Sequence, residues 1–305
     1  MLDFVIKRFL QVILVVFLAL TVVFFMIRLS GDPTTLFLPP DAPREQIEEY
    51  RELLGFNRPL YVQYGDFMIN AVQGDFGESL RSHEDALQIV LDRFPATFQL
   101  AISALIISLS IAIPLGVLSA YKRNTVFDKI GVGLTVVGQA VPSFWLGLIL
   151  IYFFAAQFKM LPYGGGGSLV HMILPTITLA AYSVARFTRF TRSAMLDVMR
   201  KDYIRTAKSS GVPTRRLIMR YALRNSLIPI ITLVALDLGV LLGGAVITEV
   251  VFSWPGIGRL LMQSLMNRDF PIVLAGVFII ALTYAVINFI ADVLYAYVNP
   301  QIRVK

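Results

Sequence analysis

Apolar residues dominate six separate stretches of this 305-residue chain, and each stretch is long enough to cross a bilayer. A hydrocarbon core of about 30 Å needs roughly 20 apolar residues in an α-helix. The stretches cover residues 9–27, 96–121, 130–158, 161–185, 225–248 and 270–291, and the fifth is interrupted once, by Asp237. We therefore predict an all-α membrane protein with six transmembrane helices.

Charged residues, glycines and prolines mark the boundaries between the spans and the segments outside the membrane. Residues 1–29 hold the N-terminus and the first span, residues 30–95 form an acidic cap with short amphipathic helices, and residues 96–305 form a five-helix core. The predicted core consists of spans at 96–121, 130–158, 169–187, 226–248 and 270–298, with a cytoplasmic loop at 188–225. The glycine run at 164–167 predicts a flexible outer loop before the fourth span.

The distribution of basic residues sets the orientation of the spans. If both termini lie in the cytoplasm, that side holds eighteen of the 27 Lys and Arg, while the outer side holds fourteen of the 20 Asp and Glu. An excess of Lys and Arg in short loops marks the cytoplasmic side. The sequence therefore predicts N-in, C-in topology.

Composition narrows the classes of function. With 56% hydrophobic residues, 15% charged residues and a mean hydropathy of +0.71, the chain has too little polar surface for a soluble globule. The formal charge of +7 is placed by the topology beside the membrane, so it does not indicate nucleic-acid binding. Absence of cysteine excludes disulfide frameworks and thiolate metal sites, and His83 and His171 are too isolated to predict a metal site.

The acidic cap contains a segment with helix signals at both ends. Residues 42–55 begin after Asp41, a plausible N-cap, and end at Gly55. This helix is either an amphipathic element on the membrane surface or a docking surface for an extracytoplasmic partner. The predicted partner contacts are the acidic residues Glu45, Glu48, Glu49, Glu52, Asp75 and Glu78.

The cytoplasmic loop contains a second short helix. Residues 202–211 begin with Asp202 as a predicted N-cap and stop at Gly211, and Pro213 prevents continuation. A packed helix on basic flanks transmits displacement where a floppy loop would dissipate it. The pattern is suited to contact with a soluble partner.

This segment, followed by Arg-Asn-Ser-Leu-Ile-Pro at 224–229, resembles the coupling loop of permease subunits of ATP-binding-cassette (ABC) importers, in particular the dipeptide/oligopeptide/nickel/glutathione group. The group's Glu-Ala-Ala is replaced by Arg205, Thr206 and Ala207, and its glycine is kept as Gly211. Three further stretches resemble the same group: Gly-Asp-Phe-Gly-Glu-Ser at 74–79, Val-Pro-Ser-Phe-Trp-Leu-Gly at 141–147 and Glu-Val-Val-Phe-Ser-Trp-Pro-Gly-Ile-Gly-Arg-Leu-Leu at 249–261.

The resemblance implies a type I ABC importer permease in the bacterial inner membrane. It further implies a second permease, usually a paralogue, two ATP-binding subunits that hold ATP and Mg, and an extracytoplasmic substrate-binding protein. The residues that it assigns to ATPase coupling are Asp202, Tyr203, Arg205, Thr206, Ala207, Ser209, Ser210 and Gly211. The expected cargo is a di- or oligopeptide, glutathione included, and nickel or another small solute is the alternative cargo. A distant alternative for the class of protein is an ion-coupled secondary transporter.

Polar residues inside the spans are expected to meet protein or water, because a charge in the bilayer centre costs about 2.5–3.5 kcal/mol on insertion scales. Tyr284, Asn288 and Asp292 share one face of the last helix, and Asp237 lies within the fifth. A stripe with a four-residue repeat in the third span includes Gln139 and Ser143. Two interpretations stay open for all six: lining of a translocation path, or polar contact between helices.

The chain lacks the sequence patterns of an enzyme. It contains no Gly-x-x-x-x-Gly-Lys-Ser/Thr phosphate loop, no Gly-x-Ser-x-Gly elbow and no His-Glu-x-x-His pair. We therefore expect no catalytic residue here, and ATP hydrolysis on separate subunits.

Overall fold

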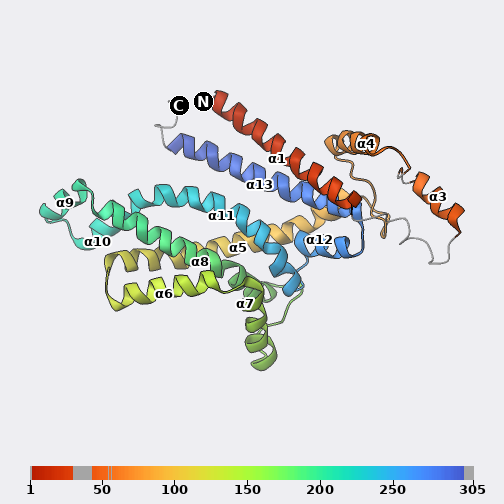
Figure 1. The fold of residues 1–305 in the computed structure, drawn as a ribbon. Coiled ribbons are helices and arrows are strands. Elements are labelled where there is room, and N and C mark those ends of the chain that lie inside the picture. The colour runs from red at the N-terminus through yellow and green to blue at the C-terminus, as the bar shows by residue number, and fades with distance from the viewer. Residues whose placement is uncertain (1, 30–42, 54, 56, 299–305) are drawn as a thin grey trace.

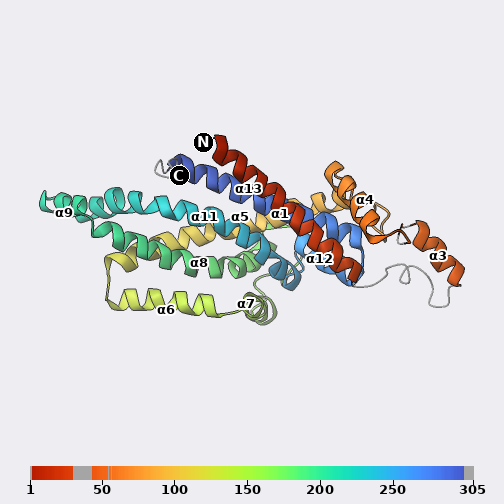
Figure 2. The same ribbon diagram turned by 45° about the horizontal axis from the view of Figure 1, so that its top comes forward.

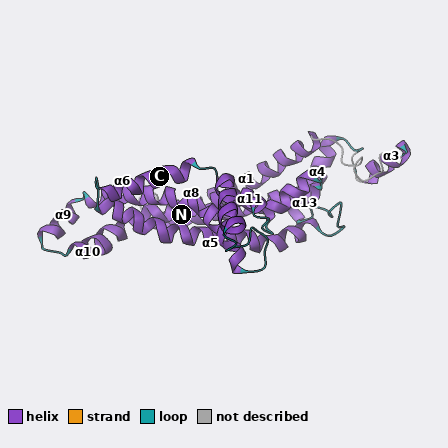
Figure 3. Ribbon diagram, turned by 90° about the horizontal axis from the view of Figure 1, so that it is seen from below, coloured by secondary structure: helices purple, strands orange, loops and turns teal. Residues whose placement is uncertain are grey.

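A computed structural model describes residues 2–29, 43–53, 55 and 57–298, and every regular segment in these ranges is helical (Figures 1 and 3). The helices, with π-helices written η, are α1 (Leu2–Leu29), α3 (Arg44–Leu53), α4 (Leu60–Gln73), α5 (Ala86–Tyr121), α6 (Val126–Ala140), α7 (Ser143–Leu150), η1 (Ile151–Gln157), α8 (Leu169–Met199), α9 (Asp202–Ser209), α10 (Thr214–Arg216), η2 (Leu217–Ala222), α11 (Leu223–Val251), α12 (Ile257–Met266) and α13 (Phe270–Val298).

Helices α5 and α8 form the centre of an elongated bundle. They pack tightly against each other, and α6 and α11 lie along α8. At Gly116 of α5 an added Cβ would lie 2.6 Å from the Cβ of Thr191, so this glycine permits the close approach of α8. Helix α1 lies against α13 (Figure 2), which places the start of α1 near the end of α13.

Four helices are long and apolar enough to span a membrane, and two bent pairs raise the number of candidate spans to six within the described residues. Helices α5 and α8 contain 36 and 31 residues, which corresponds to about 54 and 46 Å at 1.5 Å per residue. Both are longer than the hydrocarbon core of about 30 Å. Helix α5 begins ten residues before the predicted 96, because the Asp85 side chain caps it by accepting from the Gln88 amide.

The third predicted span, 130–158, is not one kinked helix. It consists of α6 and the pair α7 and η1, whose axes are bent by 100°. Pro142 disfavours helix at the residue before it, and Val141 is extended with ψ of 121°. The predicted stripe is therefore split, with Gln139 on α6 and Ser143 on α7.

Most of the predicted cytoplasmic segment 188–225 is helical. Helix α8 continues to Met199, α9, α10 and η2 follow, and α11 begins at Leu223. The charges at Arg186 and Arg189 end the apolar run, but neither residue stops a helix. The coupling segment is thus an extension of two spans. Helices α9 and α10 lie at one end of the bundle, opposite α3 and α4 (Figure 1).

Candidate translocation and coupling sites

Helix α9, predicted from the sequence as the coupling helix, is anchored by one buried residue. Ile204 is 4% exposed and packs in an apolar cluster with Met195, Leu217 and Ala222. Ala207 packs against the same cluster. The other predicted coupling residues are exposed: Asp202, Tyr203, Arg205, Thr206, Ser209, Ser210 and Gly211. The helix therefore has a fixed base and a free polar face.

The ends of α9 differ in part from the prediction. Lys201 is the N-cap and no side chain caps the helix, so the assignment of this role to Asp202 is wrong. Asp202 is the first helical residue, where its negative charge suits the positive end of the helix dipole, and its carboxylate lies 3.7 Å from Arg205. Gly211 adopts a φ of +79°, the left-handed conformation that glycine readily supplies after a helix.

Asp237 of α11 is fully buried and has two partners on α8. Its Oδ2 accepts a hydrogen bond from the Ser183 hydroxyl at 2.6 Å, and its Oδ1 accepts from the Nη1 of Arg186 at 2.7 Å. The sequence leaves open whether Asp237 lines a pathway or makes a polar contact between helices. The geometry favours the contact between helices for its carboxylate. Arg186 retains 29% exposure of its side chain.

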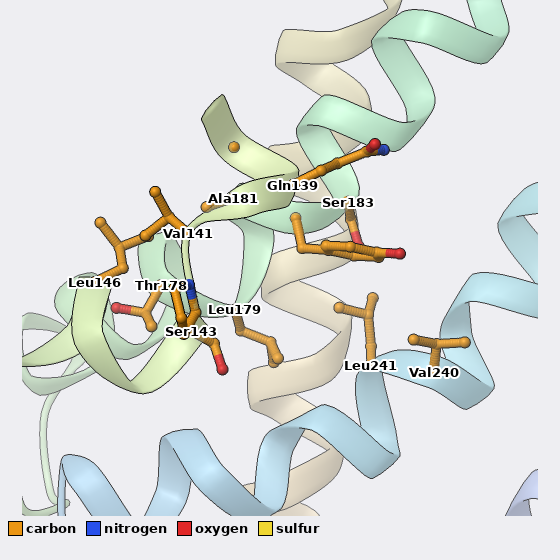
Figure 4. A pocket seen from close by; sticks show the side chains of 13 residues that line it. Gln139, Val141, Ser143, Leu146, Thr178, Leu179, Ala181, Ser183, Val240 and Leu241 are labelled. Atoms are coloured by element: carbon orange, nitrogen blue, oxygen red, sulfur yellow. The ribbon is translucent and has the colours of Figure 1, made fainter. Parts of the chain in front are cut away.

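A cavity of about 280 Å³ opens where α6 breaks from α7 (Figure 4). Gln139 and Ser143, both predicted as candidate pathway residues, line it together with Thr178 and Ser183 of α8. Ser183 thus lies between the cavity and Asp237. The apolar part of the wall is formed by residues such as Leu146, Leu179, Val240 and Leu241. The wall is thus mainly apolar, with a few polar side chains that converge on it.

A second buried ion pair ties three helices together near α9. The Nε and Nη2 of Arg192 on α8 donate to both carboxylate oxygens of Asp128 on α6, at 2.7 and 2.8 Å. Asp128 also accepts from the hydroxyl of Ser119 on α5 and from the Asn124 amide. With four donors the buried carboxylate is fully satisfied, and α6 is fixed to α5 and α8 at this end.

The polar face of α13 is turned partly toward α1. Asp292 forms an ion pair with Arg8 of α1 at 3.2 Å, and the side chain of Asn288 donates to the backbone oxygen of Tyr284. The Tyr284 ring covers Gly239 of α11, where an added Cβ would lie 2.5 Å from the ring. These three residues therefore make contacts between or within helices.

The segment 249–261 runs from the last turn of α11 through a short turn into α12, and Glu249 holds it in place. This buried carboxylate accepts from the Thr97 hydroxyl at 2.6 Å and from the Arg259 amide at 3.1 Å. The Trp254 indole donates to the backbone oxygen of Ala96 at 3.0 Å. The end of α11 is thereby joined to α5.

The glycine run 164–167, predicted to be a flexible outer loop, packs closely against residues 252–255 through its first three residues. The Gly165 amide donates to the Phe252 backbone oxygen at 2.8 Å. An added Cβ at Gly164 would lie 2.0 Å from that oxygen, and one at Gly166 would lie 2.8 Å from Pro255. Glycine is required here because the backbone lies directly against the turn between α11 and α12.

The predicted outer contacts lie on exposed surface. Glu45, Glu48, Glu49 and Glu52 are exposed on α3, while their predicted N-cap Asp41 lies outside the described residues. Asp75 and Glu78 are exposed as well, and Asp75 accepts from the Gly77 amide. The adjacent Ser79 is buried and donates to Asp269 at 2.6 Å. The 74–79 stretch is therefore anchored to the start of α13 and leaves two acids free for other contacts.

Comparison with protein families distinguishes an ABC importer permease from an ion-coupled secondary transporter. A model of the "Binding-protein-dependent transport system inner membrane component" matches residues 112–304, and a model of the N-terminal part of such components matches residues 1–101. The chain belongs to this family of inner-membrane permease components. It is accordingly a multi-pass inner-membrane protein of an ABC importer, as the sequence resemblance predicted.

Individual relatives and solved structures agree with this membership. The glutathione transport system permease proteins GsiC of Escherichia coli K12 and of Shigella dysenteriae serotype 1 are each 40% identical to the chain over the full length of both. The MetNI methionine ABC transporter, with a TM-score of 0.56 and 14% identity, covers 70% of this permease and 97% of its own chain. An amino acid ABC transporter has a TM-score of 0.54 at 18% identity, with coverages of 70% and 94%. The fold is that of type I importer permeases.

Sequence reasoning missed the partners of the buried carboxylates. From the sequence, Arg186 and Arg192 are expected only to set the topology, and Glu249 has no predicted contact. Arg186 could have been found, because a charged residue near the end of a span is expected to have a partner and Asp237 is an available carboxylate in a neighbouring span. The Glu249 contact with Thr97 joins residues 152 positions apart, and the sequence carries no signal for it.

Proposed function

We propose that this permease carries small peptides, glutathione included, into the cell as one half of a membrane channel whose opening is driven by ATP. The observation that carries the proposal is the 40% identity with GsiC over the full length of both chains. The cavity beside the α6–α7 break supports it, because its mainly apolar wall carries a few polar groups, such as Gln139 and Ser143, that can hydrogen-bond a peptide.

The complex that this function requires has four further parts. A second permease, a paralogue of this one, completes the pathway, two ATP-binding subunits hold ATP and Mg, and a periplasmic protein delivers the substrate. The present chain contributes no catalytic residue and no cofactor of its own, in line with the absence of a phosphate loop from its sequence.

The ATPase subunits dock on α9 in this proposal. Its exposed residues Tyr203, Arg205 and Thr206 enter a groove of the ATPase, while Ile204 holds the helix to η2 and to the end of α8. Because α8 runs without interruption from this end into the wall of the cavity, a displacement of α9 is transmitted to the pathway as a rigid-body movement.

The candidate polar residues divide into two roles. Gln139 and Ser143 line the pathway, whereas Asp237, Tyr284 and Asp292 hold helices to one another and Asn288 bonds within α13. On the outer side, the acids of α3 together with Asp75 and Glu78 contact the binding protein. This contact explains why the charge of the cap is concentrated on exposed surface.

The experiment that tests the substrate uses the permease with its partner subunits in proteoliposomes. Labelled glutathione, a dipeptide and Ni²⁺ are supplied in turn with the cognate binding protein. We expect ATP-dependent uptake of glutathione or the dipeptide and none of Ni²⁺. Uptake of Ni²⁺ alone would reassign the cargo while leaving the family intact.

A further inference from the structure

A groove of about 350 Å³ runs between α5, α6 and α8, and the proposed function gives it no role. Its wall is almost entirely aliphatic. Ile107, Ile111 and Leu115 of α5 form one side, and Ile177 and Val184 of α8 form another. The three isoleucines and the leucine keep 36–43% exposure, so the groove is open along its length.

The groove and the cavity beside the α6–α7 break lie on opposite flanks of the contact between α6 and α8. At this contact a Cβ added to Gly138 would lie 3.1 Å from the Cβ of Ala185, and Ala181 lines both spaces. Helix α11 lines only the cavity, whereas α5 lines only the groove. Because the proposed pathway lies between two permeases, the cavity faces the second permease and the groove faces the bilayer.

The groove follows the helix axes, as the acyl chains of a bilayer do. The lining residues extend from 107 to 115 on α5 and from 177 to 188 on α8, which corresponds to about 12 and about 16 Å at 1.5 Å per residue. One leaflet supplies about half of a hydrocarbon core that is about 30 Å thick. The length and the aliphatic wall therefore fit one acyl chain.

The end of the groove at Leu115 leads to a cluster of positive charge. The turn between α5 and α6 lies at the same end of the bundle as α9 (Figure 1), which the topology places in the cytoplasm. Lys122, Arg123 and Lys129 lie in or beside this turn, and none forms an ion pair within the described part of the chain. The nearby Asp128 is occupied by other donors. Basic clusters between helices on the cytoplasmic side bind anionic lipid headgroups.

Thr188 adds an unused hydrogen-bond donor at the same end. It is 3% exposed and lines the groove, and its hydroxyl has no hydrogen-bond partner among the described residues. A buried polar group without a partner is costly. Threonine in a helix divides between two χ1 rotamers, so rotation of the side chain can turn the hydroxyl into the groove. The ester carbonyl of a lipid is an acceptor of the required kind.

We propose that this groove binds one anionic phospholipid of the cytoplasmic leaflet. An acyl chain fills the groove, and an ester carbonyl accepts a hydrogen bond from Thr188. The phosphate lies against Lys122, Arg123 and Lys129. This site goes beyond the proposed function, because it concerns a lipid and not the cargo, and only the side that the groove faces rests on the proposed pathway.

The first test fills the groove and counts bound lipid. The transporter with its partner subunits is placed in nanodiscs of equal parts phosphatidylglycerol and phosphatidylcholine and is then extracted into mild detergent, and retained lipid is counted by native mass spectrometry. A Cβ at Gly131, which lines the groove, would lie 3.6 Å from its nearest neighbour, so Gly131→Leu places its side chain in the groove without a clash at Cβ. We expect retained phosphatidylglycerol to fall at least fivefold. Gly133→Leu on the same helix lies outside the groove lining and should leave retention unchanged.

The second test removes the charges at the headgroup end. Lys122, Arg123 and Lys129 are replaced together by Gln. Each basic residue near the membrane surface strengthens binding of anionic lipid about fivefold, so the preference for phosphatidylglycerol over phosphatidylcholine should fall at least tenfold. The control makes the same change in net charge near α9, where Arg215, Arg216 and Arg220 are exposed, and should keep the preference.

Equal lipid retention in Gly131→Leu and Gly133→Leu, or an unchanged preference in the triple variant, would overturn the proposal. If Gly131→Leu does not assemble, the triple variant decides alone. A cysteine at Ile111, in a chain that has none of its own, tests the competing occupant. Its crosslinking to the second permease would show that protein covers the groove and would also overturn the proposal. Because bound lipid is measured, failure of glutathione uptake would refute the proposed function without deciding this one.

Discussion

At the scale of single residues, the buried carboxylates of this permease are satisfied by partners on other helices. Asp237 illustrates the cost of changing one of them. Asp237→Asn leaves Arg186 without its counter-charge and turns one acceptor into a donor. We expect the detergent-solubilised complex to lose on the order of 1–3 kcal/mol of stability, measured as a lower midpoint of thermal unfolding. An unchanged midpoint would contradict the buried contact.

A substitution at Gly164 tests whether the glycine run 164–167 packs against the turn that follows α11. An alanine there would place Cβ 2.0 Å from the Phe252 backbone oxygen, and the resulting displacement should cost about 1–3 kcal/mol. The control is Gly133→Ala in α6, where nothing lies within 4 Å of the added Cβ. Thermal unfolding should separate the two variants, and equal midpoints would show that the loop is free after all.

Single residues show why the sequence predicts the helices but not the contacts between them. The apolar runs of α5 and α13 are sufficient to predict helices, because the bilayer permits little else. The contact between Glu249 and Thr97 depends on the packing of helices that are distant in the sequence, which the sequence does not encode locally. A glycine run is also ambiguous, since a residue without a Cβ serves equally in a free loop and in close backbone contact.

At the scale of elements, coupling between ATP hydrolysis and transport depends on movement of α9. Gly211→Pro is incompatible with the φ of +79° at this position. We expect it, and the charge reversal Arg205→Glu, to lower substrate-stimulated ATPase activity several-fold while the chain still inserts. The assay compares hydrolysis with and without loaded binding protein.

Crosslinking gives the control for α9. Cysteines at Ser209 and Ser210, which are exposed, should crosslink to the ATPase subunit, whereas a cysteine at Gln73 in α4, which lies at the opposite end of the bundle (Figure 1), should not. Crosslinks that never reach the ATPase from either serine would refute the docking of α9.

The sequence predicts the positions of some helix ends and breaks but not the angles between helices, for a physical reason. Helix α9 has a stop signal in Gly211 and could be located from it, although its N-cap was misassigned. The break between α6 and α7 follows from Pro142, but a proline does not fix the angle between two helices, which here depends on packing against α8 and α11. Charges ended the predicted fourth span at 187, yet the helix continues because its hydrogen bonds do not require a bilayer.

At the scale of the whole molecule, opposite ends of the bundle carry different surfaces. The four exposed acids of α3 are proposed to contact the binding protein. Replacing Glu45, Glu48, Glu49 and Glu52 together by Gln should weaken the affinity for that protein and reduce its dependence on salt, since exposed charges act over about a Debye length. Asp197→Asn on α8, at the other end, is the control for a change in net charge. Equal affinities at low salt would leave α3 as a surface helix without this role.

Family and fold could be predicted from the sequence, and the pathway could not. The resemblance extends along the whole chain and its implied class is confirmed by the family model. Lining of a pathway depends on which polar side chains stay uncovered after packing. Gln139 and Ser143 line the cavity beside the α6–α7 break, whereas Tyr284, Asn288 and Asp292 line a second cavity between α1 and α13.

The central claim is that this chain converts ATP hydrolysis on other subunits into inward movement of a peptide. The most direct measurement is glutathione uptake by proteoliposomes that contain both permeases, with the ATPase subunits and loaded binding protein added or withheld. The account predicts uptake only when both are present with ATP and Mg, unchanged when proton and sodium gradients are abolished, and lost in Gly211→Pro. Uptake that follows an ion gradient and persists without the ATPase subunits would contradict it.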